Sequence, residues 1–479
     1  MKKMAIFLVF PQLRQTARLK RVRDYVLVYG PHPSQVARIH PSCALVLSLC
    51  TGGHSAMEIA WLYAQTYDIP EESAIETVKT ILTRFPFALL LLPTRDPAPI
   101  ERYSPKTFLF PGSNSTFDSS RNEPFEVPAG INLNLTFACN FRCIYCYQVV
   151  TNVTREMLPL SKCLSLAEEA STWGVVYFGI TGGEPTLFPG WLTLVEKVLS
   201  CGMTPVMTSN GAVIGSSPSI ARRLSVAGME RMTISLDASY PELHDRMTQS
   251  TGAFPRVVRA IQYLVEAGIR VVVKLVLTPI NYADLEDFID FVAGLGVEEV
   301  GISFQEGGAT GSPANFLHSL TSAQIEEAGA LVAKKARLLE GRCAIHPPKP
   351  PSLAWTDGVM PCGSLLMGMS IFPNGDVGIC DKLPNASEFL YGNVLRQGLE
   401  EIWNGEQLQR IRSRTVDPSQ IDAQCSSCTR LHECRTGCFV DSFNAAANYF
   451  AKHPDCGGPF SDPGGATPEK GQWRENSCN

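Results

Sequence analysis

Six short runs rich in apolar and β-branched residues alternate with helical segments, and this alternation constrains the fold more than any other feature. The runs cover residues 131–137, 175–181, 205–209, 232–237, 271–278 and 300–305. Strands that alternate with helices pair in parallel, because each helix returns the chain to the same end of the sheet. The sequence therefore predicts an α/β domain, as an open barrel or a doubly wound sheet, with its functional residues at the carboxyl ends of the strands.

Regions that differ from this core in composition and residue pattern lie on either side of it. Before it, an extended segment at 25–28 is followed by three helical patterns, near residues 41–49, 57–62 and 75–85, which predicts a small winged-helix-like module. The expected boundaries are 1–93 for this module, 94–126 for a linker rich in Pro, Ser, Asn and Asp, 127–340 for the α/β core, 341–456 for a cysteine-rich domain and 457–479 for a disordered tail rich in Gly, Pro and Ser.

Composition narrows the class of protein. Charged residues make up 18% of the 479 residues and the formal net charge is -5, so nucleic acid is not an expected partner. The apolar run at residues 4–10 precedes Pro11 and several basic residues, with no small-residue cleavage site, which argues against a signal peptide. No apolar stretch reaches the length needed to span a bilayer, so no membrane association is expected. The chain has 16 cysteines, and the cytoplasm, where thiols stay reduced, is the expected compartment.

A group of three cysteines, Cys139, Cys143 and Cys146, follows the first predicted strand. A loop in this position can fold three thiolates around one four-iron cluster and leave the fourth iron without a protein ligand, in contrast to the four-cysteine ligation of pure electron carriers. Two other interpretations stay open: a zinc knuckle, which lacks a fourth ligand nearby, and three unrelated buried cysteines.

The CxxxCxxC spacing, with Tyr145 before its last cysteine, resembles the radical S-adenosylmethionine (SAM) superfamily. A second motif, Gly182-Gly183-Glu184-Pro185, stands directly after the second predicted strand, where it is similar to the family motif that holds the methionine amine. The resemblance implies a partial (β/α)6 TIM-like barrel with one SAM-binding 4Fe-4S cluster. In this family the reduced cluster cleaves SAM, and the resulting 5'-deoxyadenosyl radical abstracts hydrogen from an unactivated C–H bond.

The same resemblance extends to polar residues at the ends of the third and fourth strands. It implies that these residues reach the ribose and carboxylate of SAM: Ser209, Asn210, Ser235 and Asp237. Tyr145 is expected to flank the adenine, mainly through backbone contacts. Polar residues at strand ends also cap the helices that follow, so a structural role is the alternative.

Seven later cysteines resemble the pattern of a SPASM domain, which carries auxiliary 4Fe-4S clusters: Cys362, Cys380, Cys425, Cys428, Cys434, Cys438 and Cys456. The resemblance implies one cluster on Cys425, Cys428, Cys434 and Cys456, and another on Cys362, Cys380 and Cys438. The cluster on Cys362, Cys380 and Cys438 would lack a fourth cysteine ligand. Cys343, a substrate thiolate or no ligand at all are the three possibilities. The alternative for the whole group is a structural zinc site on Cys425, Cys428, Cys434 and Cys438.

The N-terminal module resembles the pyrroloquinoline quinone D-like (PqqD-like) fold through residues 39–45, 49–52 and 57–60. In relatives, the leader of a ribosomally made precursor peptide adds a strand to the sheet of this module. A structural or dimerising domain is the alternative.

In this order the three parts resemble a peptide maturase of the sactisynthase or ranthipeptide-synthase type, supplied with electrons by a flavodoxin or ferredoxin. The implied reaction is a cysteine thioether crosslink. Carbon–carbon crosslinking, epimerisation, formylglycine formation in sulfatases, modification of a cofactor precursor and a non-enzymatic electron carrier are the rival hypotheses.

Overall fold

The computed structural model describes residues 9–30, 35–109, 124–148, 157–305, 319–347, 362–383, 386–429, 431–454 and 456. The chain forms two compact units. The first comprises Met1–Pro348 and Ser364–Gly405, and the second comprises Lys349–Gly363 and Glu406–Asn479. Each unit is described by itself below.

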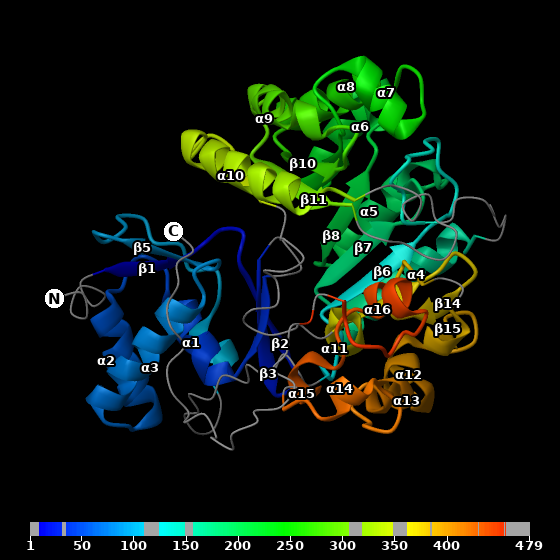
Figure 1. Ribbon diagram of the computed structural model, residues 1–479. Coiled ribbons are helices and arrows are strands. Elements are labelled where there is room, and N and C mark those ends of the chain that lie inside the picture. Colours follow the sequence, from blue (N-terminus) through cyan, green and yellow to red (C-terminus); the bar gives the residue numbers. More distant parts are fainter. Residues whose placement is uncertain are drawn as a thin grey trace. The chain divides into compact units, whose positions relative to one another are not determined.

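The first unit is built on a sheet with the strand order β12-β11-β10-β9-β8-β7-β6-β13-β14-β15 (Figure 1). From β12 to β13, each strand pairs in parallel with its neighbour. These strands are β6 (Gly130–Asn134), β7 (Tyr177–Thr181), β8 (Thr204–Ser209), β9 (Arg231–Ser235), β10 (Arg270–Leu277), β11 (Glu299–Phe304), β12 (Ala344–His346) and β13 (Gly368–Ile371). The six predicted strands correspond to β6–β11, so the α/β barrel-type fold is confirmed.

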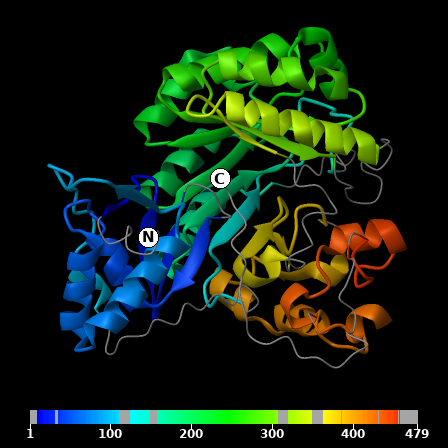
Figure 2. The same cartoon turned by 60° about the vertical axis from the view of Figure 1, so that its left-hand side comes forward.

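Helices follow the strands and lie along one side of them (Figure 2). They are α4 (Leu160–Trp173), α5 (Trp191–Ser200), α6 (Pro218–Val226), α7 (Pro241–Thr248), α8 (Ala253–Glu266), α9 (Leu285–Gly294) and α10 (Ser322–Leu338). Helix α8 shows why they pack there: Val257, Ile261 and Leu264 recur at helical spacing and are fully buried. The strands contribute their own apolar residues to this core, such as Val271, Val273 and Leu275 of β10.

The sheet continues beyond residue 340, where the sequence analysis placed a domain boundary. After α11 (Gly363–Met367), β13 pairs with the outer side of β6, and β14 (Asp376–Gly378) and β15 (Leu390–Asn393) extend the sheet in antiparallel fashion. Helix α12 (Leu399–Asn404) follows, and its Trp403 donates a hydrogen bond to the carbonyl of Phe125 at 2.8 Å. The sheet continues past residue 340 because β6 would otherwise have an unpaired edge, and β13 covers this edge.

The N-terminal module contains a three-stranded antiparallel sheet in the order β2-β3-β4 and a two-stranded sheet, β1-β5. Its elements are β1 (Phe10–Leu13), β2 (Arg18–Val22), β3 (Tyr25–Tyr29), β4 (Val36–Ile39), α1 (Pro41–Leu49), α2 (Ala56–Tyr67), α3 (Glu71–Arg84) and β5 (Leu89–Leu92). The sequence predicted β3 and the three helices. It missed the other strands, which have only four or five residues and in β2 alternate with arginine and lysine.

The module makes polar contacts with the amino-terminal ends of the barrel strands. The hydroxyl of Tyr177, the first residue of β7, donates to the carbonyl of Gly30 at 2.7 Å. The Lys20 ammonium donates to the carbonyl of Val175 at 3.2 Å, and Arg18 pairs with Glu230 at 2.6 Å. Residues of β2 and the residues next to the end of β3 and the start of β4 therefore all contact the barrel.

Part of the expected linker belongs to the module. Arg102 donates to the carbonyl of Arg14 at 2.7 Å, and the Tyr103 hydroxyl accepts from the Leu19 amide at 3.0 Å. Phe108, in a short 3-10 helix at Pro105–Phe108, is buried in the module core. Residues 110–123 and the expected tail from 457 lie outside the described residues.

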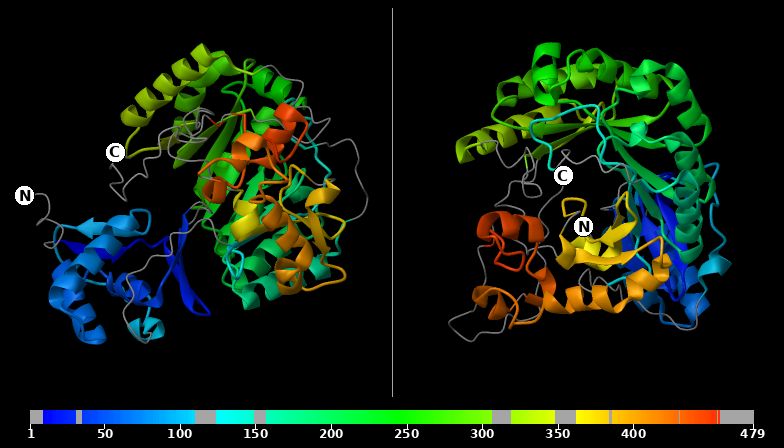
Figure 3. Two further views of the ribbon diagram at one scale, coloured as in Figure 1. Left: turned by 60° about the horizontal axis from the view of Figure 1, so that its bottom comes forward. Right: turned by 90° about the vertical axis from the view of Figure 1, so that its right-hand side faces the viewer.

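The second unit consists of short helices joined by irregular chain (Figure 3). They are α13 (Glu406–Arg414), α14 (Ala423–Ser426), α15 (Leu431–Cys434) and α16 (Phe439–Ala446). A small apolar core includes Phe439 and Phe450, whose ring centroids are 5.6 Å apart. In the described part of the chain, no helix is both long and apolar enough to cross a membrane.

Candidate active site

The cysteine loop, residues 139–146, leaves the carboxyl end of β6 and is held against the end of β7 by two glycines. The Gly183 amide donates to the Thr136 carbonyl at 2.7 Å, and the Glu184 amide donates to the Ala138 carbonyl at 2.8 Å. A Cβ on Gly182 or Gly183 would lie 2.3 Å from one of these carbonyl oxygens, and Gly182 has a φ of 136°. Only glycine allows the two loops to approach so closely.

Glu184 is the centre of a buried hydrogen-bond network. Its carboxylate accepts from the Asn210 amide at 2.7 Å, from the Ser209 hydroxyl at 2.8 Å and from the Thr186 amide at 3.0 Å. Pro185 begins the short helix that Glu184 caps. Burial raises the pKa of Glu184, while these hydrogen bonds act in the opposite direction. All of these donors are neutral.

Asn210 connects this network to the cysteine loop. Its side-chain oxygen accepts from the Ala212 amide at 3.0 Å, which directs the NH2 group toward the loop. That group donates to the Asn140 side-chain oxygen at 2.8 Å and lies 3.9 Å from the Cys139 sulfur. The backbone amide of Phe141 also donates to the Cys139 sulfur, at 3.4 Å. Asn210 therefore contacts the loop itself in the structure.

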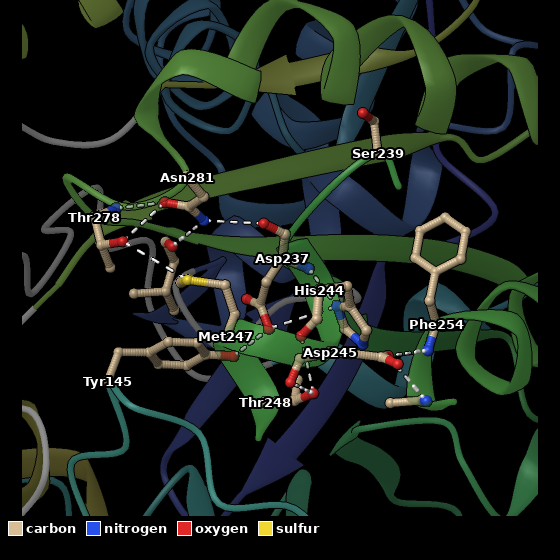
Figure 4. A network of polar contacts seen from close by, with 12 residues as sticks. Tyr145, Asp237, Ser239, His244, Asp245, Met247, Thr248, Phe254, Thr278 and Asn281 are labelled. Carbon is tan, nitrogen blue, oxygen red and sulfur yellow. Dashed lines mark hydrogen bonds and ion pairs between the residues drawn. The ribbon is translucent and has the colours of Figure 1, made fainter. Parts of the chain in front are cut away.

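The other side of the cysteine loop rests on the end of α7. The Arg142 amide donates to the Thr248 carbonyl at 2.9 Å, and the Ile144 amide donates to the Met247 carbonyl at 3.0 Å. The Tyr145 hydroxyl donates to the Asp237 carboxylate at 2.7 Å (Figure 4). The loop is thus fixed by β9 and α7 as well as by the ends of β7 and β8.

Asp237 is held in place from three directions (Figure 4). Its amide donates to Nδ1 of His244 at 3.2 Å, its carbonyl accepts from the Asn281 side chain at 3.0 Å, and its carboxylate accepts from Tyr145. Burial raises the pKa of Asp237 to about 7 and lowers that of His244 to about 4. One oxygen of the Asp237 carboxyl, Oδ1, is buried without a hydrogen-bond partner among the described residues.

A cavity of about 1200 Å³ lies between the cysteine loop and the carboxyl ends of the strands. Its lining includes Cys139, Cys143, Cys146, Tyr145, Gly182, Gly183, Glu184, Ser209, Asn210, Ser235 and Asp237. The structure therefore brings these predicted residues to one cavity. Pro185 begins the short helix that follows Glu184. The predicted contacts of these residues with SAM stay a prediction. Burial raises the pKa of the Cys139 thiol to about 11 and that of Cys143 well above its usual value.

Several cavity residues were not predicted from the sequence. The Tyr147 hydroxyl donates to the Asp381 carboxylate at 2.8 Å, and the Lys382 ammonium lies 5.6 Å from the centroid of the Tyr147 ring. Tyr147 directly follows Cys146 and Asp381 directly follows Cys380, so this contact joins two cysteine-bearing segments of the first unit. The sequence signal that could have identified Tyr147 and Asp381 is that each directly follows a cysteine expected to bind a cluster. Lys274 of β10 and Phe304 of β11 also line the cavity.

In the second unit the later cysteines divide into two groups. Burial first, then Asp422, and then Cys434, Cys456 and Cys428 raise the pKa of the Cys425 thiol to about 12. Cys438 is affected instead by burial, by Asp441 and, to a smaller extent, by Cys362, with its pKa also raised to about 12. The turn between Cys434 and Cys438 has three consecutive residues of positive φ, Arg435, Thr436 and Gly437.

Cys343 occupies a different place from Cys380 in the first unit. It precedes β12, whose first residue is in register with Glu299 at the start of β11, so it lies at the amino-terminal end of the sheet. Cys380 is at the cavity, next to the Tyr147–Asp381 contact. Cys343 as an additional ligand beside Cys380 stays a prediction.

The thiols are not arranged around a single ion. Within the described ranges, no three His, Cys, Asp or Glu side chains converge closely enough to hold one metal ion. A four-iron cluster has its thiolates on different irons and spaces them more widely than one zinc ion does. The loop of three half-buried thiols on an open cavity has the donor set that such a cluster needs.

Comparisons with known proteins agree with this geometry. Residues 133–292 match the radical SAM superfamily, and residues 362–429 match the iron-sulfur cluster-binding SPASM domain. The chain is a radical SAM enzyme with an additional SPASM region, and its cofactors are SAM and 4Fe-4S clusters.

Individual relatives cover most of the chain. The mycofactocin maturase MftC of Mycobacterium tuberculosis is 28% identical over 71% of this chain and 85% of its own length. The PqqA peptide cyclase of Ruegeria pomeroyi is 26% identical over 69% of this chain and 88% of its own length. The crystal structure of Streptococcus suis SuiB bound to the precursor peptide SuiA is similar in fold, with a TM-score of 0.64 at 14% identity, over 93% of this chain and 100% of that one.

Proposed function

We propose that the chain binds a ribosomally made precursor peptide and modifies it by hydrogen abstraction, forming a cysteine thioether crosslink. The observation that carries the proposal is the size and placement of the cavity. At about 1200 Å³ it is above the range of about 300–1000 Å³ typical of small-molecule pockets, as expected of a cavity that would hold the cluster, SAM and the reacting residue of a peptide. Two relatives, a mycofactocin maturase and a PqqA peptide cyclase, support the same substrate class.

In this proposal Cys139, Cys143 and Cys146 hold the SAM-binding cluster. When bound, the cluster and SAM supply the 5'-deoxyadenosyl radical that abstracts hydrogen from the substrate. Glu184 is buried and accepts hydrogen bonds from the neutral groups of Thr186, Ser209 and Asn210, so a bound methionyl ammonium would be its counter-charge. Ser209, Asn210, Ser235 and Asp237 would contact the remainder of SAM.

The SPASM cysteines would hold the two auxiliary clusters. Cys425, Cys428, Cys434 and Cys456 would hold one, in line with the mutual influence of their thiols. Cys362, Cys380 and Cys438 would hold the other. These clusters would accept the electron released when the crosslink closes, a flavodoxin or ferredoxin would reduce the SAM cluster, and the reaction would take place in the cytoplasm.

The N-terminal module would bind the leader of the precursor as a PqqD-like element does. Its three-stranded sheet has β2 and β4 as its edges. Contacts of Arg18 and Lys20 with the barrel are on the β2 side. The edge of β4 has no second partner strand in the described sheet and is the one to which a leader would add a strand, with main-chain hydrogen bonds supplying the affinity.

Co-expression with a short cysteine-containing reading frame beside the gene, followed by mass spectrometry of the peptide, tests the reaction. A loss of two hydrogens per event with a blocked thiol is the expected result. A crosslinked peptide that keeps its free thiol would indicate a carbon–carbon bond instead of a thioether. An unchanged mass with deuterium uptake would indicate epimerisation. An unmodified peptide together with an activated sulfatase or an altered cofactor precursor would refute the proposal.

Two proline variants test the binding edge. Neighbouring residues of β4 direct their amides to opposite sides, so Ala37→Pro and Arg38→Pro each remove one amide, toward β3 or toward the free edge. The variant that loses the outward amide should keep its thermal stability and weaken leader binding about tenfold or more. Unchanged binding by both variants would rule out strand addition at β4.

A further inference from the structure

Four arginines lie on neighbouring elements around the outer side of the cysteine loop. Arg142 is within the loop, Arg246 is in α7, and Arg256 and Arg259 are in the first turns of α8. The loop is in contact with α7, because the Arg142 amide donates a hydrogen bond to the carbonyl of Thr248, the last residue of α7. Helices α7 and α8 are also neighbours, and we call these four residues on adjoining elements the arginine face.

The charges of the arginine face are not neutralised within the described chain. Arg142 donates to the carbonyls of Cys139 and Phe141, at 2.5 and 2.8 Å. Arg256 donates to the Gly252 carbonyl at 3.0 Å and Arg259 to the Gly215 carbonyl at 3.3 Å. None of the four forms an ion pair with a described carboxylate. By contrast, Arg18, Arg23 and Arg223 of the same unit all do so.

The nearby acidic residues do not cancel this charge. Asp245 accepts hydrogen bonds from the amides of Gly252, Ala253 and Phe254, at 2.5, 3.0 and 3.1 Å, so its carboxylate serves the amino terminus of α8. Glu242 is the other acidic residue of α7. Four cations against two carboxylates is a local excess of positive charge in a chain whose formal net charge is -5.

The position of this surface indicates its role. Arg142 stands between Cys139 and Cys143, and its side chain is exposed, so the loop that carries the ligands reaches the outside of the protein here. Arg142 also lines the substrate cavity, whereas Arg246, Arg256 and Arg259 are not among its lining residues. A protein that delivers an electron can approach the loop from this surface without entering the cavity.

We propose that the arginine face is the docking surface for an acidic one-electron carrier protein. This inference rests on the proposed function, in which such a donor reduces the SAM-binding cluster. One electron passes from the reduced carrier to the cluster, so the carrier is oxidised and the cluster is reduced by one electron each. Complementary charge would steer the carrier to this surface and make the association depend on ionic strength.

Charge reversal tests the proposal on the cluster-loaded full-length chain. The variant Arg246→Glu/Arg256→Glu spares the cysteine loop, and Lys334→Glu/Arg337→Glu, which reverses two exposed cations of α10, is the matched control. A flavodoxin is the probe, and its dissociation constant is measured at several salt concentrations. We expect about tenfold or more weaker binding at low salt for the first variant only, with the difference shrinking above about 0.3 M salt.

A second readout separates this proposal from the proposed function. SAM cleavage without peptide should fall when reduced flavodoxin is the donor and stay unchanged with dithionite, which needs no docking surface. Equal flavodoxin binding by the arginine variant and the control would overturn the proposal. So would lost affinity for the precursor peptide with intact flavodoxin binding. If the double variant unfolds, the neutral variants Arg246→Gln and Arg259→Gln give the same comparison.

Discussion

The cysteine loop of the barrel and the cysteine-rich second unit hold their thiols by different means. The loop is bonded to the ends of β7 and α7 and, through Tyr145, to Asp237 of the β9 end, all by contacts of the protein itself. The second unit has helices of only four to nine residues and a turn in which Arg435 and Thr436 both have positive φ. Such residues cost about 1–2 kcal/mol each. The cysteine loop is thus held by contacts of the protein itself, whereas we expect folding of the second unit to depend on bound clusters.

Removing the thiols of each region is the strongest test of this difference. We expect Cys139→Ala/Cys143→Ala/Cys146→Ala to abolish SAM cleavage, by about 10³-fold or more, while the barrel keeps its thermal stability, because protein contacts hold the loop. Cys425→Ala/Cys428→Ala/Cys434→Ala should instead unfold the second unit. Limited proteolysis and iron content measure both results.

The expected proteolysis pattern is specific. The second triple variant should be cleaved within residues 406–456 while the barrel stays intact, and it should lose about four irons. Cleavage of the barrel in the first variant, or protection of the second unit in the other, would contradict the proposed difference. Replacement of the lost iron by zinc with full protection would favour the structural zinc site.

His244 is expected to limit the stability of the barrel in acid. Its pKa in the folded protein is lowered to about 4 by burial, against 6.5 for an ordinary histidine. The unfolded chain therefore binds the proton first, and stability falls as the pH drops from about 6.5 to 4, by up to roughly 3 kcal/mol. Asp237 acts in the opposite sense, because its pKa is raised to about 7.

Thermal unfolding between pH 4 and 7 measures the effect. His244→Asn keeps an acceptor for the Asp237 amide and should reduce the loss of stability in acid, whereas His54→Asn in the N-terminal module should leave the curve of the wild type unchanged. Identical pH profiles for the wild type and His244→Asn would show that His244 does not contribute.

A smaller effect is expected from the Tyr145 hydroxyl. Tyr145→Phe removes the donor to the buried Asp237 carboxylate and leaves both of its oxygens without a partner among the described residues. The cost should be about 1–2 kcal/mol, measured by denaturant unfolding. Tyr282→Phe, which removes a surface hydrogen bond to Glu327, is the matched control and should cost less. Equal losses would mean that the Tyr145 contact is no stronger than a surface bond.

The sequence predicted the barrel strands and the cavity residues well because both have strong local signals. Buried parallel strands are continuous apolar runs, and Cys139 and Gly183 belong to motifs with fixed spacing. The contacts between distant segments, such as Tyr147 with Asp381, could not be predicted, because a hydrogen bond across 234 positions leaves no periodic pattern. The pairing of β13 with β6 was missed for the same reason.

The attachment of the N-terminal module has a consequence for the length of the substrate. The module contacts the start of β7 at Tyr177, while the cavity is reached at its other end, at Thr181. The four steps from Tyr177 to Thr181 span roughly 13 Å at about 3.3 Å each. If the module binds the leader as proposed, the peptide would need a spacer of at least about four extended residues before its first modifiable position. The enzyme would act as a molecular ruler, skipping cysteines that stand closer to the leader.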